Sequence, residues 1–148
     1  MAVTTSLGTV FSAVEGSPAT YDQAGFAALT LVAVGEVADI GEFGGEGEIL
    51  THTPISTGIV SKLLGSIDYG TIALQMGRFI GDAGQTALKA GFDGADQGKT
   101  FSFSVVYIDG AIDYFTGIVS SFSSVVGSAS SVRGASANIA LNNKVIEA

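Results

Sequence analysis

Residues 65–122 constrain the fold most, because one strand, one short helix and two further strands follow one another there. In the first part Ile72, Leu74 and Met76 alternate with smaller or polar residues, a period of two that is typical of a strand with one apolar face. A sheet with one apolar face must cover that face, and a single helix is available to do so. We therefore predict a small core of β-strands and one helix.

The helix is predicted from the segment after this strand, which reads GDAGQTALKAG. Asp82 can accept hydrogen bonds from the free amides of a first turn, and Leu88 and Phe92 are spaced to lie on one face. Gly91 can adopt the left-handed conformation that often ends a helix. The prediction is a short helix over residues 82–90.

Two strands are predicted after the helix. The first has apolar residues that alternate with Ser102, Ser104 and Val106, namely Phe101, Phe103, Val105 and Tyr107. Asp109 and Gly110 form a turn signal. The return strand is expected to contain Ile112, Tyr114, Ile118 and Phe122.

The flanks of this core are predicted as follows. Residues 1–25, rich in Thr, Ser, Gly and Ala, are expected to form a flexible or partner-bound N-terminal arm, in which residues 9–14 can form a strand. Residues 29–53 read as a long hairpin around an acidic, glycine-rich turn, and the C-terminal segment 137–148 as a closing strand. All of these parts are assigned to one domain that covers residues 1–148.

Residues 53–66 have no clear period, although they carry several large aliphatic residues. Apolar residues in a long loop need a partner, so we expect this segment to be a flap that contacts another subunit. The predicted contact residues are Ile55, Ile59, Val60, Leu63 and Leu64.

The composition also points to self-association. Only 14% of the 148 residues are charged, against about 25% in an ordinary soluble domain, while 47% are hydrophobic. The longest strongly apolar run is shorter than the roughly 20 residues that span a bilayer, so we expect no membrane contact. We infer that copies of the chain cover much of its surface.

Charge and residue types argue against several functions. Residues 1–61 hold seven acids and no Lys or Arg, and an acidic chain with a pI near 4.2 repels phosphate. Cysteine is absent and His52 is the only histidine, which leaves neither an ordinary zinc site nor a hydrolytic triad. We expect no enzyme activity, no metal and no cofactor.

Several phrases within residues 17–145 resemble, in their order, the major tail tube proteins of long-tailed bacteriophages. They are PATYDQAGFAALT, VGEVADIGEFG, EILTHTP, KLLGSIDYGTIALQM, DAGQTALKA, TFSFSVVYIDG and YFTGIVSSF. In the helix phrase, Gly84, Gln85 and Leu88 stand where that family has them. The ending IALNNKVIEA departs from the family, whose members often carry a Ser-Gly pair near the last strand.

The resemblance implies a mainly β fold, a β-sandwich or barrel with one flanking short α-helix and extended arms and loops. It implies a virion protein whose copies form six-membered rings, stacked into a tube that conducts genomic DNA without binding it specifically. The implied partners are the chain itself and the tail terminator, tape measure and baseplate or tip proteins, with assembly in the host cytoplasm. Acids that could line a negative lumen are Glu36, Asp39, Glu42, Glu46 and Glu48.

Two alternatives stay open. The inner tube of a contractile tail or secretion system shares the fold but passes proteins. A soluble β-sandwich that binds carbohydrate would need exposed aromatic residues, yet the chain has no Trp and most of its Phe and Tyr lie in alternating strands.

Overall fold

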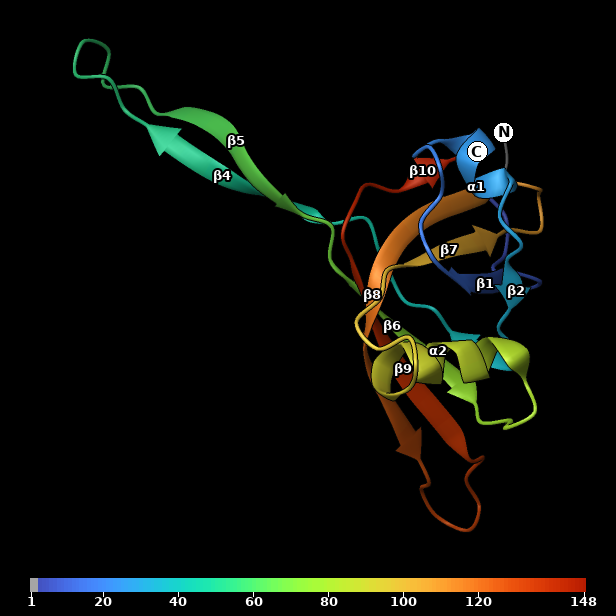
Figure 1. The fold of residues 1–148 in the computed structure, drawn as a ribbon. Helices are drawn as coiled ribbons and strands as arrows, with labels where there is room; N and C mark the ends of the chain where they lie inside the picture. Colours follow the sequence, from blue (N-terminus) through green and yellow to red (C-terminus); the bar gives the residue numbers. More distant parts are fainter. Residues whose placement is uncertain (1–2) are drawn as a thin grey trace.

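A curled sheet forms the body of the molecule, and a long hairpin leaves it (Figure 1). The computed structural model describes residues 3–148. The eight-stranded sheet has the order β2-β1-β7-β8-β9-β6-β3, with β10 beside β8, and β4 and β5 form a separate two-stranded sheet. The strands are β1 (Val10–Glu15), β2 (Val32–Ala33), β3 (Val37–Asp39), β4 (Glu46–His52), β5 (Ser61–Asp68), β6 (Thr71–Gly77), β7 (Phe101–Val106), β8 (Ile112–Val125), β9 (Gly134–Leu141) and β10 (Ile146–Glu147), and the helices are α1 (Gln23–Ala27) and α2 (Ala83–Asp93).

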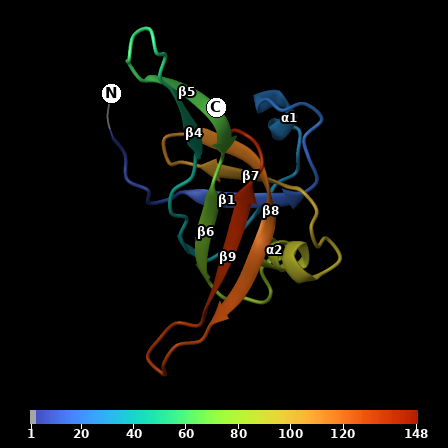
Figure 2. The ribbon, with the colours of Figure 1, turned by 90° about the vertical axis from the view of Figure 1, so that its left-hand side faces the viewer.

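The predicted mainly β fold with a flanking short helix is confirmed. The sheet curls into a half-barrel, and α2 lies against β8 and β1 (Figure 2). As the alternation predicted, Ile72, Leu74 and Met76 are buried. The ring centroids of Phe103 and Phe115 lie 5.4 Å apart, so aromatic side chains from neighbouring strands fill the same core.

Helix α2 begins as the sequence predicted but ends later. The Asp82 carboxylate caps it, accepting from the backbone N–H of Gln85 at 2.9 Å. Gly91, predicted to end the helix, lies inside it, because α2 continues to Asp93. The reason for glycine there is packing, since a Cβ at position 91 would lie 2.7 Å from the Phe101 ring.

The N-terminal segment agrees with the prediction in part. The strand expected over residues 9–14 forms as β1, but it belongs to the sheet rather than to a free arm, because it pairs with β7 and buries Phe11 and Ala13. Helix α1 was not predicted; the Asp22 side chain caps it by accepting from the backbone N–H of Gly25 at 2.8 Å. Residues 1–2 of the predicted arm lie outside the described residues.

The predicted hairpin over residues 29–53 is wrong. Within this range β2 pairs with β1, β3 pairs with β6, and β4 pairs with β5. The chain turns after β2 at Glu36, whose φ of 59° is left-handed, so β2 and β3 join different parts of the sheet. β2 and β3 are the strands at the two ends of the sheet order.

The serine-rich run over residues 120–136 also has strand structure. It forms the outer part of the β8–β9 hairpin, in which Phe122 pairs with Ala137 and Val125 with Gly134. The closing strand β9 therefore starts at Gly134 rather than 137. The last residues of the predicted C-terminal strand are not part of β9. They form a separate strand, β10, which also pairs with β8.

Candidate assembly surface

Two hairpins extend in different directions from the body (Figure 1). We call residues 46–68, which comprise β4, β5 and the loop between them, the arm. We call residues 120–136 together with the neighbouring residues 78–82 the β8–β9 end, because the backbone N–H of Arg78 donates to the Arg133 carbonyl at 3.0 Å.

The arm exposes large apolar side chains on both of its faces. Ile49 is the partner of Leu64, and Leu50 is the partner of Leu63. Residues paired across two strands share a face and successive residues alternate, so each face carries one of these pairs. Between 46% and 63% of each of these four side chains is exposed. An isolated two-stranded hairpin is marginal in water, so the arm lacks the cover that such residues normally have.

All five predicted contact residues lie on the arm, and all are exposed. Ile55, Ile59 and Val60 belong to the loop between the strands, while Leu63 and Leu64 belong to β5. Their contact with another subunit stays a prediction. The sequence reasoning missed three further exposed residues of the arm, Ile49, Leu50 and Ile67. The sequence did contain a signal for two exposed apolar faces. Residues 49 and 50 are adjacent aliphatic residues in one short strand, so their side chains must point to opposite faces.

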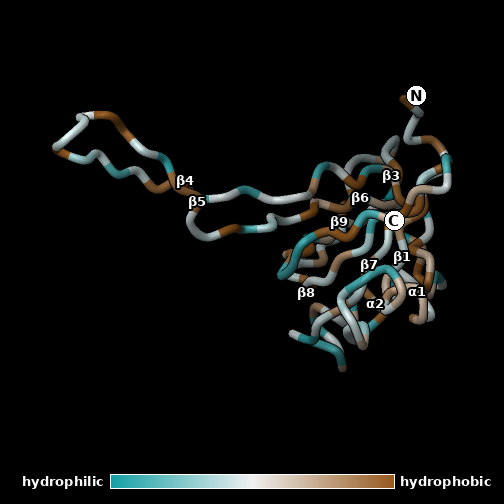
Figure 3. The backbone as a smooth tube through the Cα atoms, turned by 90° about the horizontal axis from the view of Figure 1, so that it is seen from above, coloured by the Kyte–Doolittle hydropathy of each residue, from teal (hydrophilic) through white to brown (hydrophobic). Residues whose placement is uncertain are grey.

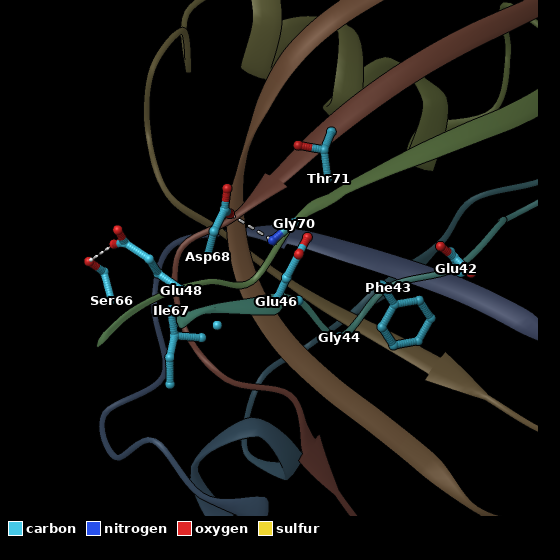
Figure 4. Close-up of a pocket in the computed structure, with 12 residues that line it drawn as sticks. Glu42, Phe43, Gly44, Glu46, Glu48, Ser66, Ile67, Asp68, Gly70 and Thr71 are labelled. Atoms are coloured by element: carbon cyan, nitrogen blue, oxygen red, sulfur yellow. Dashed lines mark hydrogen bonds between the residues drawn. The ribbon is translucent and has the colours of Figure 1, made fainter. Parts of the chain in front are cut away.

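Hydrophobic residues recur along the whole arm (Figure 3). Its base is different, because Glu42, Glu46 and Glu48 line an open hollow there together with Asp68 (Figure 4). Glu48 accepts from the Ser66 hydroxyl at 3.3 Å, and Ile67 points to the opposite side from Glu46.

The structure thus brings together three of the five acids predicted to line a lumen. The other two lie apart from the hollow: Glu36 is in the turn after β2, and Asp39 is on β3 opposite Gln75. Asp68 was not among the predicted acids. Asp68 lies near the other acids of the hollow because it pairs with Glu46 across the two strands of the arm. This pairing was not predicted, because residues 53–66 were expected to form a loop. Whether any of these acids faces a lumen stays a prediction.

The β8–β9 end has the opposite charge character. No Asp or Glu occurs in its residues 120–136, which contain Arg133, and the single acid of residues 78–82, Asp82, accepts from the backbone N–H groups of Gly35 and Gln85. Arg78 and Lys89 lie over the ring of Phe122, at 5.4 and 5.6 Å from its centroid. The same end carries five large apolar residues that are exposed: Phe79, Ile80, Val125, Val126 and Val132.

Lys89, which lies on the neighbouring helix α2, forms an ion pair with Asp93 at 2.9 Å. Within residues 3–148, neither Arg78 nor Arg133 has an ion-pair partner. The Arg78 guanidinium instead donates to the Gln85 side-chain oxygen at 3.1 Å. Two positive charges at this end are therefore available to an external acid.

A buried glutamine holds this end of the body together. Gln85 is fully buried, and its side-chain nitrogen donates to the carbonyls of Gly35 and Gly77 at 2.9 and 2.8 Å. Its side-chain oxygen accepts from Arg78 and from the backbone N–H of Phe79, each at 3.1 Å. The side chain thereby links α2 to the end of β6 and to the turn after β2, and it uses its full hydrogen-bonding capacity.

At the other end of β8, the Tyr107 hydroxyl donates to the Asp113 carboxylate at 2.6 Å. Burial, followed by this hydrogen bond and the nearby negative charges, raises the pKa of Tyr107 above its ordinary value of 10.0.

In the described part of the chain, no cluster of three His, Cys, Asp or Glu side chains is placed to hold a metal ion. None of the helices between residues 3 and 148 has the length and apolarity to cross a membrane.

No protein-family model and no curated protein sequence matches this chain. Solved structures do. A chain of the anti-feeding prophage baseplate, from a six-fold symmetrised cryo-EM structure, has a TM-score of 0.73 and 7% identity, covering 100% of this chain and 97% of that one. The chain has the fold of this baseplate chain.

Further similar structures come from an extracellular contractile injection system and from a type six secretion system. A chain of the sheath-tube complex of the extracellular contractile injection system PVC has a TM-score of 0.58 and 14% identity, with coverage of 93% of this chain and 87% of that one. A type six secretion system protein has a TM-score of 0.50 and 14% identity, with coverage of 91% and 79%. The tail-tube-like fold expected from the sequence is thus supported, although none of these three structures is described as part of a long-tailed phage.

Proposed function

We propose that this protein is a structural subunit, without catalytic activity, whose copies assemble into the tube of a phage tail or of a related injection machine. The observation that carries the proposal is the arm, whose two faces expose Ile49, Leu50, Leu63 and Leu64 to water. A protein gains free energy when a neighbouring copy removes such surface from water. The arm extends away from the body, so the neighbour rather than the body is placed to cover it (Figure 3).

The fold supports a tube as the form of the assembly. A component with this fold occurs in a six-fold symmetrised baseplate, and a ring of six subunits follows if this chain assembles in the same way. Stacked rings would form a conduit for DNA in a phage particle. The implied partners are further copies of the chain and the tail terminator, tape measure and baseplate or tip proteins, and the assembled location is the virion.

The second candidate is the inner tube of a contractile injection or secretion system, which passes proteins. The observation that favours it is the set of structural neighbours, which includes a chain of a contractile sheath-tube complex and a type six secretion protein. A sheath protein that co-purifies with the tube would favour this candidate, and tail particles filled with DNA would favour the phage tail.

Negative-stain electron microscopy of the purified protein at high concentration tests self-assembly. We expect rings or hollow rods from the wild-type protein. Leu63→Asp should give a folded monomer that does not polymerise, because it places a charge on the apolar face of the arm. The matched control is Ile108→Asp, at a residue of the turn before β8 that has the same exposed fraction as Leu63, 59%.

Isolated wild-type monomers at every concentration would contradict the proposal, and normal rods from Leu63→Asp would remove the arm from it. Cryo-electron microscopy of the same assemblies, at a resolution that shows side chains, tests the lumen acids. The hypothesis of a negative lumen fails if Glu36, Asp39, Glu42, Glu46 and Glu48 all face the outside of the tube.

A further inference from the structure

We infer that the arm of one copy docks on the β8–β9 end of another copy, so that the subunits join head to tail. This inference rests on the proposed self-assembly and adds the surface that receives the arm. The arm and the β8–β9 end both expose apolar residues that the body does not cover, and each would become the partner of the other.

Charge complementarity selects this receiving surface. The base of the arm carries Glu42, Glu46, Glu48 and Asp68 around one hollow. The β8–β9 end offers Arg78 and Arg133, which have no ion-pair partner among residues 3–148, and its single acid, Asp82, is already hydrogen-bonded to the backbone N–H groups of Gly35 and Gln85. Opposite charges that face each other at an interface steer the encounter and define its register.

Apolar surface is also matched between the two regions. Exposed aliphatic residues continue from the arm strands to its loop, where Ile55 is fully exposed. At the β8–β9 end, Phe79, Ile80 and Val126 are each at least 60% exposed. A contact between these regions buries apolar residues from both copies, and the charges can then form its polar rim.

The alternative in which two arms bind each other is disfavoured by charge. A symmetric contact of that kind brings two sets of the same acids, including Glu46, Glu48 and Asp68, towards one another. Like charges placed together oppose binding. A contact between two different surfaces also has a consequence that a symmetric contact lacks: it repeats from copy to copy and produces a closed ring or an open filament.

A mixing experiment tests the inference. Leu63→Asp impairs the arm, and Val126→Asp impairs the β8–β9 end, at a residue that is 69% exposed. Each variant alone should fail to polymerise. When mixed, the intact arm of the Val126→Asp protein should bind the intact β8–β9 end of the Leu63→Asp protein. Sedimentation velocity with two different tags should then detect finite complexes that contain both variants, and no rods.

Charge reversal provides the second measurement. Glu48→Lys and Arg133→Glu should each raise the concentration needed for assembly by at least about tenfold, and the double variant should recover most of that loss. The matched controls are Glu15→Lys and Lys144→Glu, which make the same charge changes at exposed residues outside both regions. We expect both controls to assemble like the wild type.

The outcomes separate this inference from the proposed function. If the wild type assembles and Leu63→Asp does not, but Val126→Asp assembles normally or the mixture forms no complex, the head-to-tail contact is wrong while self-assembly through the arm stands. If the wild type does not assemble at all, both proposals fail.

Discussion

The two hairpins of this protein have similar backbones but different surroundings. In the β8–β9 hairpin, Ala135, Ala137 and Ile139 point into the core and are buried, while the residues between them are half-buried. In the arm, every residue of β4 and β5 except Gly47 and Gly65 is exposed. One hairpin is stabilised along most of its length by the body, and the other is stabilised only by its own strand pairing.

This difference separates folding from assembly within one short chain. Residues of the body should govern the free energy of unfolding, whereas residues of the arm should govern association. The β8–β9 end belongs to both groups, because Phe122 packs against the core while Val125 and Val126 beside it are exposed. The following predictions test that division, beginning with the largest expected effect.

Removal of the arm should abolish assembly and leave the body folded. Glu46 and Asp68 are paired at its base, so a two-residue Asn-Gly turn in place of residues 47–67 can join them. We expect complete loss of rods by electron microscopy and a change of less than about 1 kcal/mol in the free energy of unfolding, measured by chemical denaturation. A loss of several kcal/mol would show that the arm belongs to the folding unit.

The same substitution should have different effects in the two hairpins. Ile139→Ala, at a fully buried residue of β9, should cost about 2–5 kcal/mol of stability because it leaves a cavity in the core. Ile49→Ala, at a residue of β4 that is 59% exposed, should change stability by less than about 0.5 kcal/mol and should weaken assembly. Equal stability losses in denaturation experiments would remove the distinction between the hairpins.

The sequence predicted the body better than its edges. Alternation within one segment was sufficient to place Ile72, Leu74 and Met76 in the core, and Asp82 at the start of α2, because these signals are local. The order of the strands is not local. Residues 29–53 carry short apolar runs that are compatible with a hairpin. Their actual partners in the sheet are β1 and β6, and the alternation of apolar residues within a strand does not show which other strand it pairs with.

The candidate site was predicted in part for a similar reason. Exposed apolar residues at 55–64 were recognised because a long loop with such residues needs a partner. The β8–β9 end was not recognised, because serine and glycine dominate residues 120–136 and the cations over Phe122 come from the residue after β6 and from α2. Arg78, Lys89 and Phe122 meet only after the chain has folded.

Gln85 should affect both folding and assembly, unlike residues of the arm. Gln85→Leu keeps a similar volume but leaves the partly buried carbonyls of Gly35 and Gly77 and the Phe79 amide without this partner, which should cost about 1–3 kcal/mol. It also releases Arg78 from its hydrogen bond, so we expect weaker assembly in addition. The matched control is Gln75→Leu, at an exposed glutamine of β6, which should change stability by less than about 0.5 kcal/mol. Equal stability losses from the two variants would contradict this role of Gln85.

The smallest predicted effect concerns the end of β8 that lies far from the β8–β9 end. Tyr107→Phe removes the hydrogen bond to Asp113 and should cost about 1 kcal/mol near neutral pH. Because folding raises the pKa of Tyr107, the unfolded chain releases this proton more readily, and the wild type should lose stability as the pH rises above about 10. Denaturation at a series of pH values should show a shallower alkaline decline for Tyr107→Phe, with assembly at neutral pH unchanged. An identical alkaline decline would show that Asp113 does not hold Tyr107 in its protonated form, and an assembly defect would show that this end of β8 also serves the contact between copies.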